Sequence, residues 1–321
     1  IIDAPQQSAS KVASGIMNPV TGRKLVKTWL ADLLFPFAEN CYKELETVLD
    51  VPLIKHPNIF WRLHTALQMN VFMERSGAPG YEKFIKKVAY GMPIEGLKPS
   101  KAYAEMSGVS RVDTATLIAA FATYFKNLNC LEHQQFDYNA LQLPNNKVQY
   151  KHIKANTLIF CEGYKLQDNT FFNWLPITPN KGEIIVFKCP KLQLNNTLIK
   201  GAHYIMTLGN DLFWFGSNYD RKYTNELPTE STKATLLKSL NEMLDLPYEI
   251  VTHIAAIRPS TLQRRPLLGL HPVHKQLAVF NGLGTKGVSI APYFAHEMAN
   301  FLVHNGTLHP QVNIEKWYEN A

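Results

Sequence analysis

The feature that most constrains the fold is a glycine-rich loop near the carboxyl end of the chain. The sequence Gly282-Leu283-Gly284-Thr285-Lys286-Gly287 follows an apolar stretch at residues 277–280 and precedes an amphipathic stretch at residues 293–304. These patterns predict a strand, a glycine loop and a helix, with Pro292 at the first helical position and Gly306 just past the helix. The free N–H groups that begin such a helix attract negative charge. An ordinary strand-to-helix turn would contain the same residue types.

This loop matches the pattern G-x-G-x-x-G, but the pattern alone does not make a dinucleotide site. Such a site also needs a following strand that carries an acidic residue about 20 positions later. Too little chain follows Gly287 for that unit. We therefore do not interpret the loop as a dinucleotide fingerprint.

Composition narrows the class of protein without naming a partner. The chain has 321 residues, 46% hydrophobic and 18% charged, which is enough to form the core of one or two domains. It shows neither a long apolar run nor a signal pattern, so we expect a soluble, cytoplasmic protein with no membrane partner. A net charge of +7 suits an anionic substrate, a nucleotide cofactor or RNA, although dispersed basic residues are also typical of a solvated surface.

The cysteines and histidines do not have the sequence spacing typical of metal-binding motifs. The four cysteines, at positions 41, 130, 161 and 189, are widely separated, and the 11 histidines form no motif. We predict buried thiols, no disulfide framework and no metal site.

Alternating helical and strand patterns indicate an α/β protein. Helical periodicity covers residues 25–49 and 113–128, with Asp113 as a cap for the second helix. An apolar strand buried on both faces is predicted at residues 156–161; it ends at Glu162-Gly163, and nucleotide sites often lie at such strand ends. Three strands of an antiparallel sheet are predicted next, at residues 182–189, 204–208 and 212–216. A helix at residues 232–244 and a strand at residues 250–257 follow.

The residues around Arg258 place the glycine loop in a longer pattern. The order is Arg258-Pro259, then Pro266-Leu267-Leu268-Gly269, a strand, the glycine loop and Ala291-Pro292. This order resembles the D-amino-acid oxidase superfamily of FAD-dependent oxidoreductases, in its glycine/sarcosine oxidase-like branch. Three further segments extend the resemblance over nearly the whole chain: residues 13–19, 179–184 and 204–216.

The resemblance implies FAD as cofactor, bound without a covalent link because no cysteine follows Cys189. In the family, residues like those of the 13–19 segment pass the flavin ring, an acid binds the adenosine ribose, and the last glycine loop stabilises negative charge on the reduced flavin. The residues implied in cofactor binding are Asp3, Ser14, Gly15, Ile16, Met17, Gly163, Gly284, Thr285, Lys286, Gly287 and Val288.

Members of the family begin with a strand, a G-x-G-x-x-G loop and a helix, which hold the flavin pyrophosphate. In this sequence that segment would directly precede Ile1-Ile2-Asp3. We therefore expect the chain to be a fragment that lacks it.

Two residues are implied in substrate binding. Arg258 matches the family arginine that binds the substrate carboxylate, a role that suits the planar guanidinium fork. Tyr204 resembles the tyrosine whose hydroxyl binds the same carboxylate. On composition alone, Arg258 could be a surface arginine and Tyr204 a core residue of a strand.

The resemblance implies an α/β fold with a Rossmann-like FAD-binding domain, as in glutathione reductase, and an interleaved substrate domain with an antiparallel sheet. We assign residues 1–45, 105–165 and 250–321 to the first domain, and residues 46–104 and 166–249 to the second.

The expected reaction is oxidation of an amino acid or secondary amine by hydride transfer to the flavin, with oxygen as the acceptor. One alternative is the oxidase half of an enzyme that modifies the wobble uridine of tRNA, which residues 14–15 and 282–287 also resemble. Another, of a different class, is a non-catalytic scaffold or interaction protein. The sequence predicts no oligomeric state.

Overall fold

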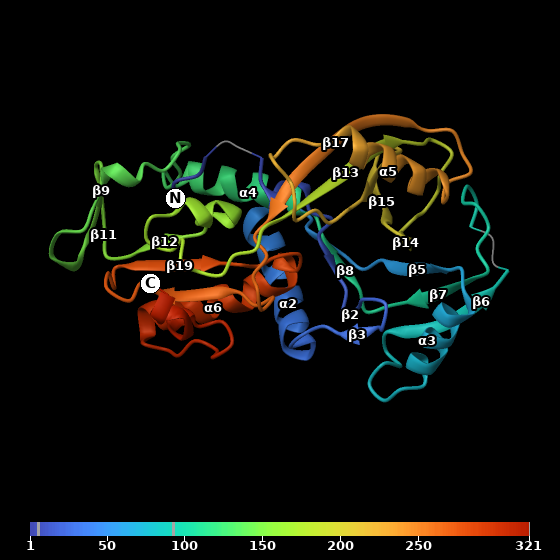
Figure 1. The fold of residues 1–321 in the computed structure, drawn as a ribbon, viewed down its shortest axis with the longest axis horizontal. Helices are drawn as coiled ribbons and strands as arrows, with labels where there is room; N and C mark the ends of the chain where they lie inside the picture. Colours follow the sequence, from blue (N-terminus) through green and yellow to red (C-terminus); the bar gives the residue numbers. More distant parts are fainter. Residues whose placement is uncertain (5–6, 92–93, 321) are drawn as a thin grey trace.

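The computed structural model describes residues 1–4, 7–91 and 94–320. Figure 1 shows two groups of elements beside each other, between which the chain passes several times. One group contains β12 (Leu158–Phe160), β19 (Leu277–Asn281) and α6 (Gly287–His304). The other is built around one large sheet. Both chain ends lie on the side of the first group (Figure 1).

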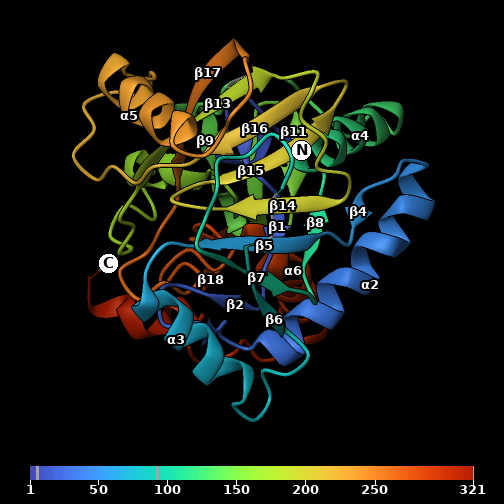
Figure 2. The ribbon, with the colours of Figure 1, turned by 90° about the vertical axis from the view of Figure 1, so that its right-hand side faces the viewer.

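The large sheet has eight strands, and its middle is the antiparallel sheet predicted from the sequence. Figure 2 shows the eight strands side by side, from β17 to β6. All neighbouring pairs are antiparallel except β14 with β5. In spatial order the strands are β17 (Glu249–Arg258), β13 (Asn180–Lys188), β16 (Leu212–Gly216), β15 (Tyr204–Gly209), β14 (Thr197–Lys200), β5 (Asn58–Leu63), β7 (Ala102–Met106) and β6 (Ile85–Tyr90).

The two faces of this sheet are covered by different parts of the chain. Because successive side chains of a strand point to opposite faces, Ile185 and Ile184 belong to different cores. Ile185 packs in the same cluster as Leu236 and Leu240 of α5 (Glu230–Asn241). Ile184 packs in the cluster that includes Ile16 from the amino-terminal segment. The second face is therefore turned toward the residues predicted to pass a flavin.

Smaller sheets complete the fold. Within one of them, β12 runs parallel to β19, and β19 runs antiparallel to β18. In another, β8 lies between β1 and β4. The short strands are β1 (Ile16–Met17), β2 (Val20–Thr21), β3 (Val26–Lys27), β4 (Ile54–Lys55), β8 (Ser110–Val112), β9 (Leu141–Gln142), β10 (Val148–Tyr150), β11 (Ile153–Ala155) and β18 (Leu267–Leu270).

Most predicted elements are present with shifted ends. Asp113 caps α4 as predicted, since its carboxylate accepts a hydrogen bond from the Thr116 N–H at 3.1 Å. The buried strand is shorter than predicted, and Ile159 in β12 is 42% exposed, so one face of that strand is not covered. The helices besides α5 and α6 are α1 (Ala9–Val12), α2 (Ala31–Leu49), α3 (Ala66–Ser76), α4 (Thr114–Asn127), and the 3₁₀ turns η1 (Tyr138–Ala140), η2 (Pro144–Asn146), η3 (Gly163–Asp168) and η4 (Ile314–Asn320).

The predicted start of the last helix was wrong. Pro292 lies inside α6, which begins at Gly287, and the helix ends at Asn305 in a left-handed conformation before Gly306. A proline in a helix leaves the carbonyl four residues earlier without its usual partner. Here that carbonyl belongs to Val288, and it accepts a hydrogen bond of 2.8 Å from the Tyr42 hydroxyl of α2. The tertiary contact replaces the hydrogen bond that Pro292 cannot make.

Among the described residues, no helix is long and apolar enough to cross a membrane. The cytoplasmic location and the division into two domains stay predictions. The large sheet includes β17, whose residues the sequence assigned to the cofactor domain.

Candidate active site

The glycine loop begins where two parallel strands end together. At this edge, the Asn281 side chain joins the strand ends: its Nδ2 donates to the Gly163 carbonyl at 3.0 Å, and its Oδ1 accepts from the Gly282 N–H at 2.7 Å. Gly284 has φ +59°, a left-handed conformation that glycine adopts without strain, and its N–H donates to the Pro259 carbonyl at 3.1 Å. The loop is therefore tied to the backbone directly after Arg258.

Lys286 caps the start of α6 with its ammonium group turned inward. Its Nζ donates to the hydroxyls of Thr28 at 2.8 Å and Thr21 at 3.2 Å. Burial lowers the pKa of Lys286 to about 8, with a further contribution from Arg265. No carboxylate of a described residue pairs with this ammonium group, and the first N–H groups of α6 lack helical partners. This end of the helix therefore has positive potential that nothing in the described chain neutralises.

The amino-terminal segment lies against this helix start. Gly15, at φ +70°, packs so closely on β8 that a Cβ would lie 1.8 Å from the Val112 carbonyl oxygen, so no other residue fits. Ile16 and Met17 then pair with β8, while Arg111 donates to the Ser14 carbonyl at 3.2 Å. The structure thus brings the predicted residues 14–17 beside residues 284–288, and Met17 packs in one cluster with Val288.

Asn18 is a buried polar residue of the 13–19 segment to which the sequence assigned no role of its own. Its Oδ1 accepts a hydrogen bond from the Val20 N–H at 3.0 Å, whereas its buried Nδ2 makes no well-formed hydrogen bond in the part of the chain that is described and neighbours the Tyr204 hydroxyl. Buried donors are rarely left unsatisfied in native proteins, so this group is suited to a ligand atom. Its place directly after the 14–17 segment is the signal that could have identified it.

Arg258 ends β17 and is held by neutral oxygen atoms. Its Nη1 donates to Asn180 Oδ1 at 2.8 Å and to the Asn218 carbonyl at 3.3 Å, and its Nη2 donates to Ser217 Oγ. The Tyr219 ring lies 4.7 Å from the guanidinium carbon. Space for the guanidinium depends on Gly182, where an added Cβ would lie 1.9 Å from Nη2. Both Asn180 and Gly182 lie in the 179–184 segment singled out in the sequence.

The charge of this guanidinium is not balanced by a protein carboxylate. Burial lowers the pKa of Arg258, and among the described residues no Asp or Glu forms an ion pair with it. Hydrogen bonds to neutral oxygens fix its orientation but leave the charge itself uncompensated. An incoming carboxylate would supply that charge.

Tyr204 lies on the same side of the large sheet as Arg258, as the register of β13, β16, β15 and β17 shows. It pairs across strands with Gly216, the residue before Ser217. Burial raises the pKa of Tyr204, and the neighbouring Asn18 side chain partly offsets this effect. The Lys200 ammonium lies 4.4 Å from the centre of its ring, and burial lowers the pKa of Lys200 to about 8. Nothing in the sequence pattern pointed to Lys200.

Two predicted cofactor residues, Asp3 and Thr285, are exposed in this structure. The Asp3 N–H bonds to the Glu132 carbonyl at 3.0 Å. Thr285 lies at the turn of the glycine loop. Within the described ranges, no group of three His, Cys, Asp or Glu side chains could hold a metal ion.

The chain matches the model of the family described as FAD dependent oxidoreductase over residues 3–301. It belongs to that family. Over 122 residues it is 29% identical to a glycine oxidase of Pseudomonas putida, a stretch that covers 37% of this chain and 33% of that protein. A glycine oxidase of Pseudomonas aeruginosa is 26% identical over 132 residues, covering 40% and 36%. The match therefore spans only about a third of the length of these curated relatives.

Solved structures with the same fold confirm the predicted fold class. The glycine oxidase from Geobacillus kaustophilus has a TM-score of 0.79 at 17% identity, covering 99% of this chain and 90% of that one. The iminodiacetate oxidase from Chelativorans has a TM-score of 0.74 at 18% identity, with coverage of 99% and 91%. At these identities the similarity establishes the fold alone.

Two features of the described residues suit a flavin. The start of α6, with Lys286, suits a group that gains negative charge on reduction, and the 14–17 segment reaches this helix where Met17 packs with Val288. The residues that would contact the cofactor are those around Gly15 and Met17 on one side and the loop at 284–288 on the other.

Proposed function

We propose that this oxidoreductase oxidises an amino acid or a carboxylate-bearing secondary amine with non-covalently bound FAD, and that oxygen accepts the electrons. The observation that carries the proposal is the uncompensated guanidinium of Arg258, which three neutral oxygens hold in place on the sheet face that also carries Tyr204. The relatives named above include a glycine oxidase and an iminodiacetate oxidase, and the substrates named for both carry an amine and a carboxylate.

The chain's own residues position the substrate. Arg258 binds the carboxylate two-pronged, and the Tyr204 hydroxyl adds a hydrogen bond. Fixing one end of the substrate in this way holds the carbon that bears the amine at a constant place, which lowers the entropic cost of reaction. Bound FAD supplies a two-electron acceptor for the hydride on that carbon.

The start of α6 would stabilise the negative charge that the cofactor gains on reduction. Lys286 and the first N–H groups of α6 are fixed before reaction, so negative charge that develops near them is stabilised without rearrangement. The resulting imine would hydrolyse in water after release.

The test uses protein from the complete reading frame, reconstituted with FAD and kept without oxygen. Amino acids and N-alkyl glycines are added singly, and absorption of the oxidised flavin near 450 nm is followed. Bleaching by one of these compounds, restored by air with release of peroxide, is the expected result. A protein that holds FAD but is bleached only by amines without a carboxylate would contradict the assignment of Arg258.

Arg258→Gln separates this proposal from a general loss of folding. It keeps a hydrogen-bond donor but removes the charge, so we expect FAD to remain bound while bleaching by the carboxylate substrate slows strongly. Full-speed bleaching in this variant would rule out the carboxylate contact. A protein that gains no flavin at all would favour the non-catalytic alternative.

A further inference from the structure

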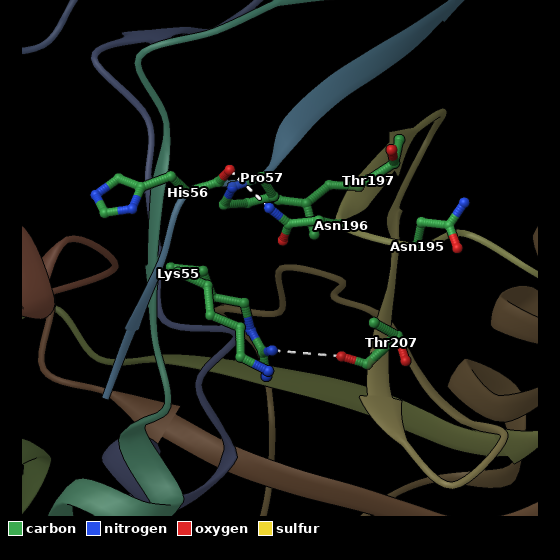
Figure 3. Close-up of a pocket in the computed structure, with 9 residues that line it drawn as sticks. Lys55, His56, Pro57, Asn195, Asn196, Thr197 and Thr207 are labelled. Atoms are coloured by element: carbon green, nitrogen blue, oxygen red, sulfur yellow. Dashed lines mark hydrogen bonds between the residues drawn. The ribbon is translucent and has the colours of Figure 1, made fainter. Parts of the chain in front are cut away.

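A second cavity lies away from Arg258, at the junction of the small β1–β8–β4 sheet with the large sheet. Its volume is about 450 Å³, which is within the range of small-molecule sites. Lys55 and Thr207 lie on opposite sides of this space in Figure 3. The described residues that line it are Lys55, His56, Pro57, Arg111, Asn195, Asn196, Thr197, Leu198 and Thr207.

Two cations face each other across strands at the base of this cavity. Lys55 on β4 and Arg111 on β8 are direct partners in the antiparallel register, so their side chains lie on the same face. Like charges placed directly opposite each other destabilise a sheet unless an anion lies between them. If these two positions only stabilised the sheet, we would expect residues of opposite charge, such as a lysine and a glutamate.

Arg111 is held in position by groups that do not cancel its charge. Its Nε donates to the Ser14 carbonyl at 3.2 Å, and its Nη1 donates to the Thr207 carbonyl at 3.3 Å. Burial lowers the pKa of Arg111, while the Asp113 charge acts in the opposite direction. The Asp113 carboxylate itself caps α4 through the Thr116 N–H.

Lys55 is more exposed than Arg111, and its Nζ forms no ion pair with any residue that the structure describes. Of the acids on packed elements, Glu39 of α2 pairs with His56 at 2.7 Å and Lys43 at 3.2 Å, and Glu46 of the same helix accepts hydrogen bonds from the Leu53 and Ile54 N–H groups. None of the lining residues in the described chain is acidic.

The remaining lining groups are neutral and polar. The Asn196 amide donates to the His56 carbonyl at 2.8 Å and so fixes the loop, while the side chains of Asn195 and Thr197 line the cavity. An ammonium and a guanidinium side by side carry two positive charges, which match a phosphate monoester better than a single carboxylate. We propose that this cavity binds the phosphate group of a small phosphorylated molecule.

Titration calorimetry on the FAD-saturated protein tests this site directly, with inorganic phosphate, glycerol 3-phosphate and succinate as probes. We expect saturable binding of a phosphate probe that is tighter than binding of succinate. Lys55→Gln should weaken phosphate binding about tenfold, because one charge-assisted hydrogen bond is lost. Asn195→Asp, which keeps the left-handed backbone at φ +48° and adds a negative charge, should weaken it as well.

Lys154→Gln serves as the matched control, because Lys154 is an exposed lysine on β11 that does not line the cavity. Its phosphate affinity should stay within twofold of the wild-type value. Absence of saturable phosphate binding, tighter binding of succinate, or equal phosphate affinity in Lys55→Gln and wild type would each overturn the proposal. These outcomes do not depend on amine oxidation, so they are independent of the proposed function.

Discussion

A buried cation at the start of β13 and a partly buried one at the end of β17 differ in how their charge is balanced. Lys181 is 1% exposed, and its Nζ lies 3.3 Å from the Glu183 carboxylate and 2.9 Å from the Leu227 carbonyl. Arg258 pairs across strands with Asn180, the residue next to Lys181, yet contacts only neutral oxygens. The same short stretch of sheet therefore contains one compensated and one uncompensated cation.

The carboxylate that balances Lys181 is itself surrounded by protein groups. Glu183 accepts hydrogen bonds from the Thr229 N–H at 2.9 Å and hydroxyl at 3.1 Å, and His253 Nε2 lies 2.9 Å from its carboxylate. Because Thr229 caps α5, the cluster fixes that helix to the sheet. A buried charge with a protein partner thus indicates a structural role, and one without a partner indicates a ligand.

The largest expected effect is on substrate use by Arg258→Gln. We expect kcat/KM for the carboxylate substrate to fall about 10³-fold, since a buried charge pair with the substrate is lost. The free energy of unfolding should change by only about 1 kcal/mol, because the neutral oxygens that lose a donor carry no charge and no protein carboxylate is left unpaired. Steady-state kinetics and urea unfolding measure both quantities. A large loss of stability would place Arg258 in the structural class with Lys181.

Glu183→Gln should have the opposite profile. The free energy of unfolding is expected to fall by about 3 kcal/mol, since Lys181 loses its carboxylate in a buried place. Urea unfolding measures it. The control is Glu105→Gln, which removes a surface pair with Lys87 of 3.5 Å and should cost less than about 1 kcal/mol. Equal losses of stability in the two variants would show that the buried Glu183–Lys181 pair contributes no more to stability than a surface ion pair.

Gly182→Ala should displace the Arg258 side chain without removing its charge, and so tests whether the position of the guanidinium matters. The new Cβ would lie 1.9 Å from Nη2, so the guanidinium must shift, and KM for the carboxylate substrate should rise about 30-fold. Gly77→Ala at the end of α3 is the control, since its Cβ would meet no atom closer than 3.9 Å. An unchanged KM in Gly182→Ala would mean that the position of the guanidinium is not critical.

The smallest effect concerns Lys286, the second uncompensated cation. Its folded pKa of about 8 lies below its ordinary value of about 10.4, so the cost of burying its charge is fully present below pH 8. That cost is relieved as the pH rises toward 10.4, because the folded protein loses the proton first. Between pH 7 and 9.5, the unfolding free energy of flavin-free wild type should rise relative to Lys286→Met by about 1 kcal/mol. A constant difference across this range would contradict the lowered pKa.

Local sequence patterns were sufficient for the elements and for much of the candidate site. The strand at residues 277–281, the glycine loop and the Asp113 cap follow from periodicity and from residues with one favoured backbone conformation. The 13–19 and 179–184 segments were identified by their resemblance to the family. The structure supplies the physical reason for a glycine in each of them: Gly15 lies against Val112 and Gly182 against Arg258, residues distant in the chain.

Tertiary structure alone decided which charges are balanced. Lys181 and Arg258 look equivalent in the sequence, and only the packing of β13, β17 and α5 gives one a carboxylate and the other neutral oxygens. The same holds for the Lys55 and Arg111 pair, which is set by strand register, and for Pro292, whose place inside α6 depends on Tyr42. The sequence determined the elements because backbone preferences are local, whereas charge balance depends on partners that are distant in the chain and meet only in the folded protein.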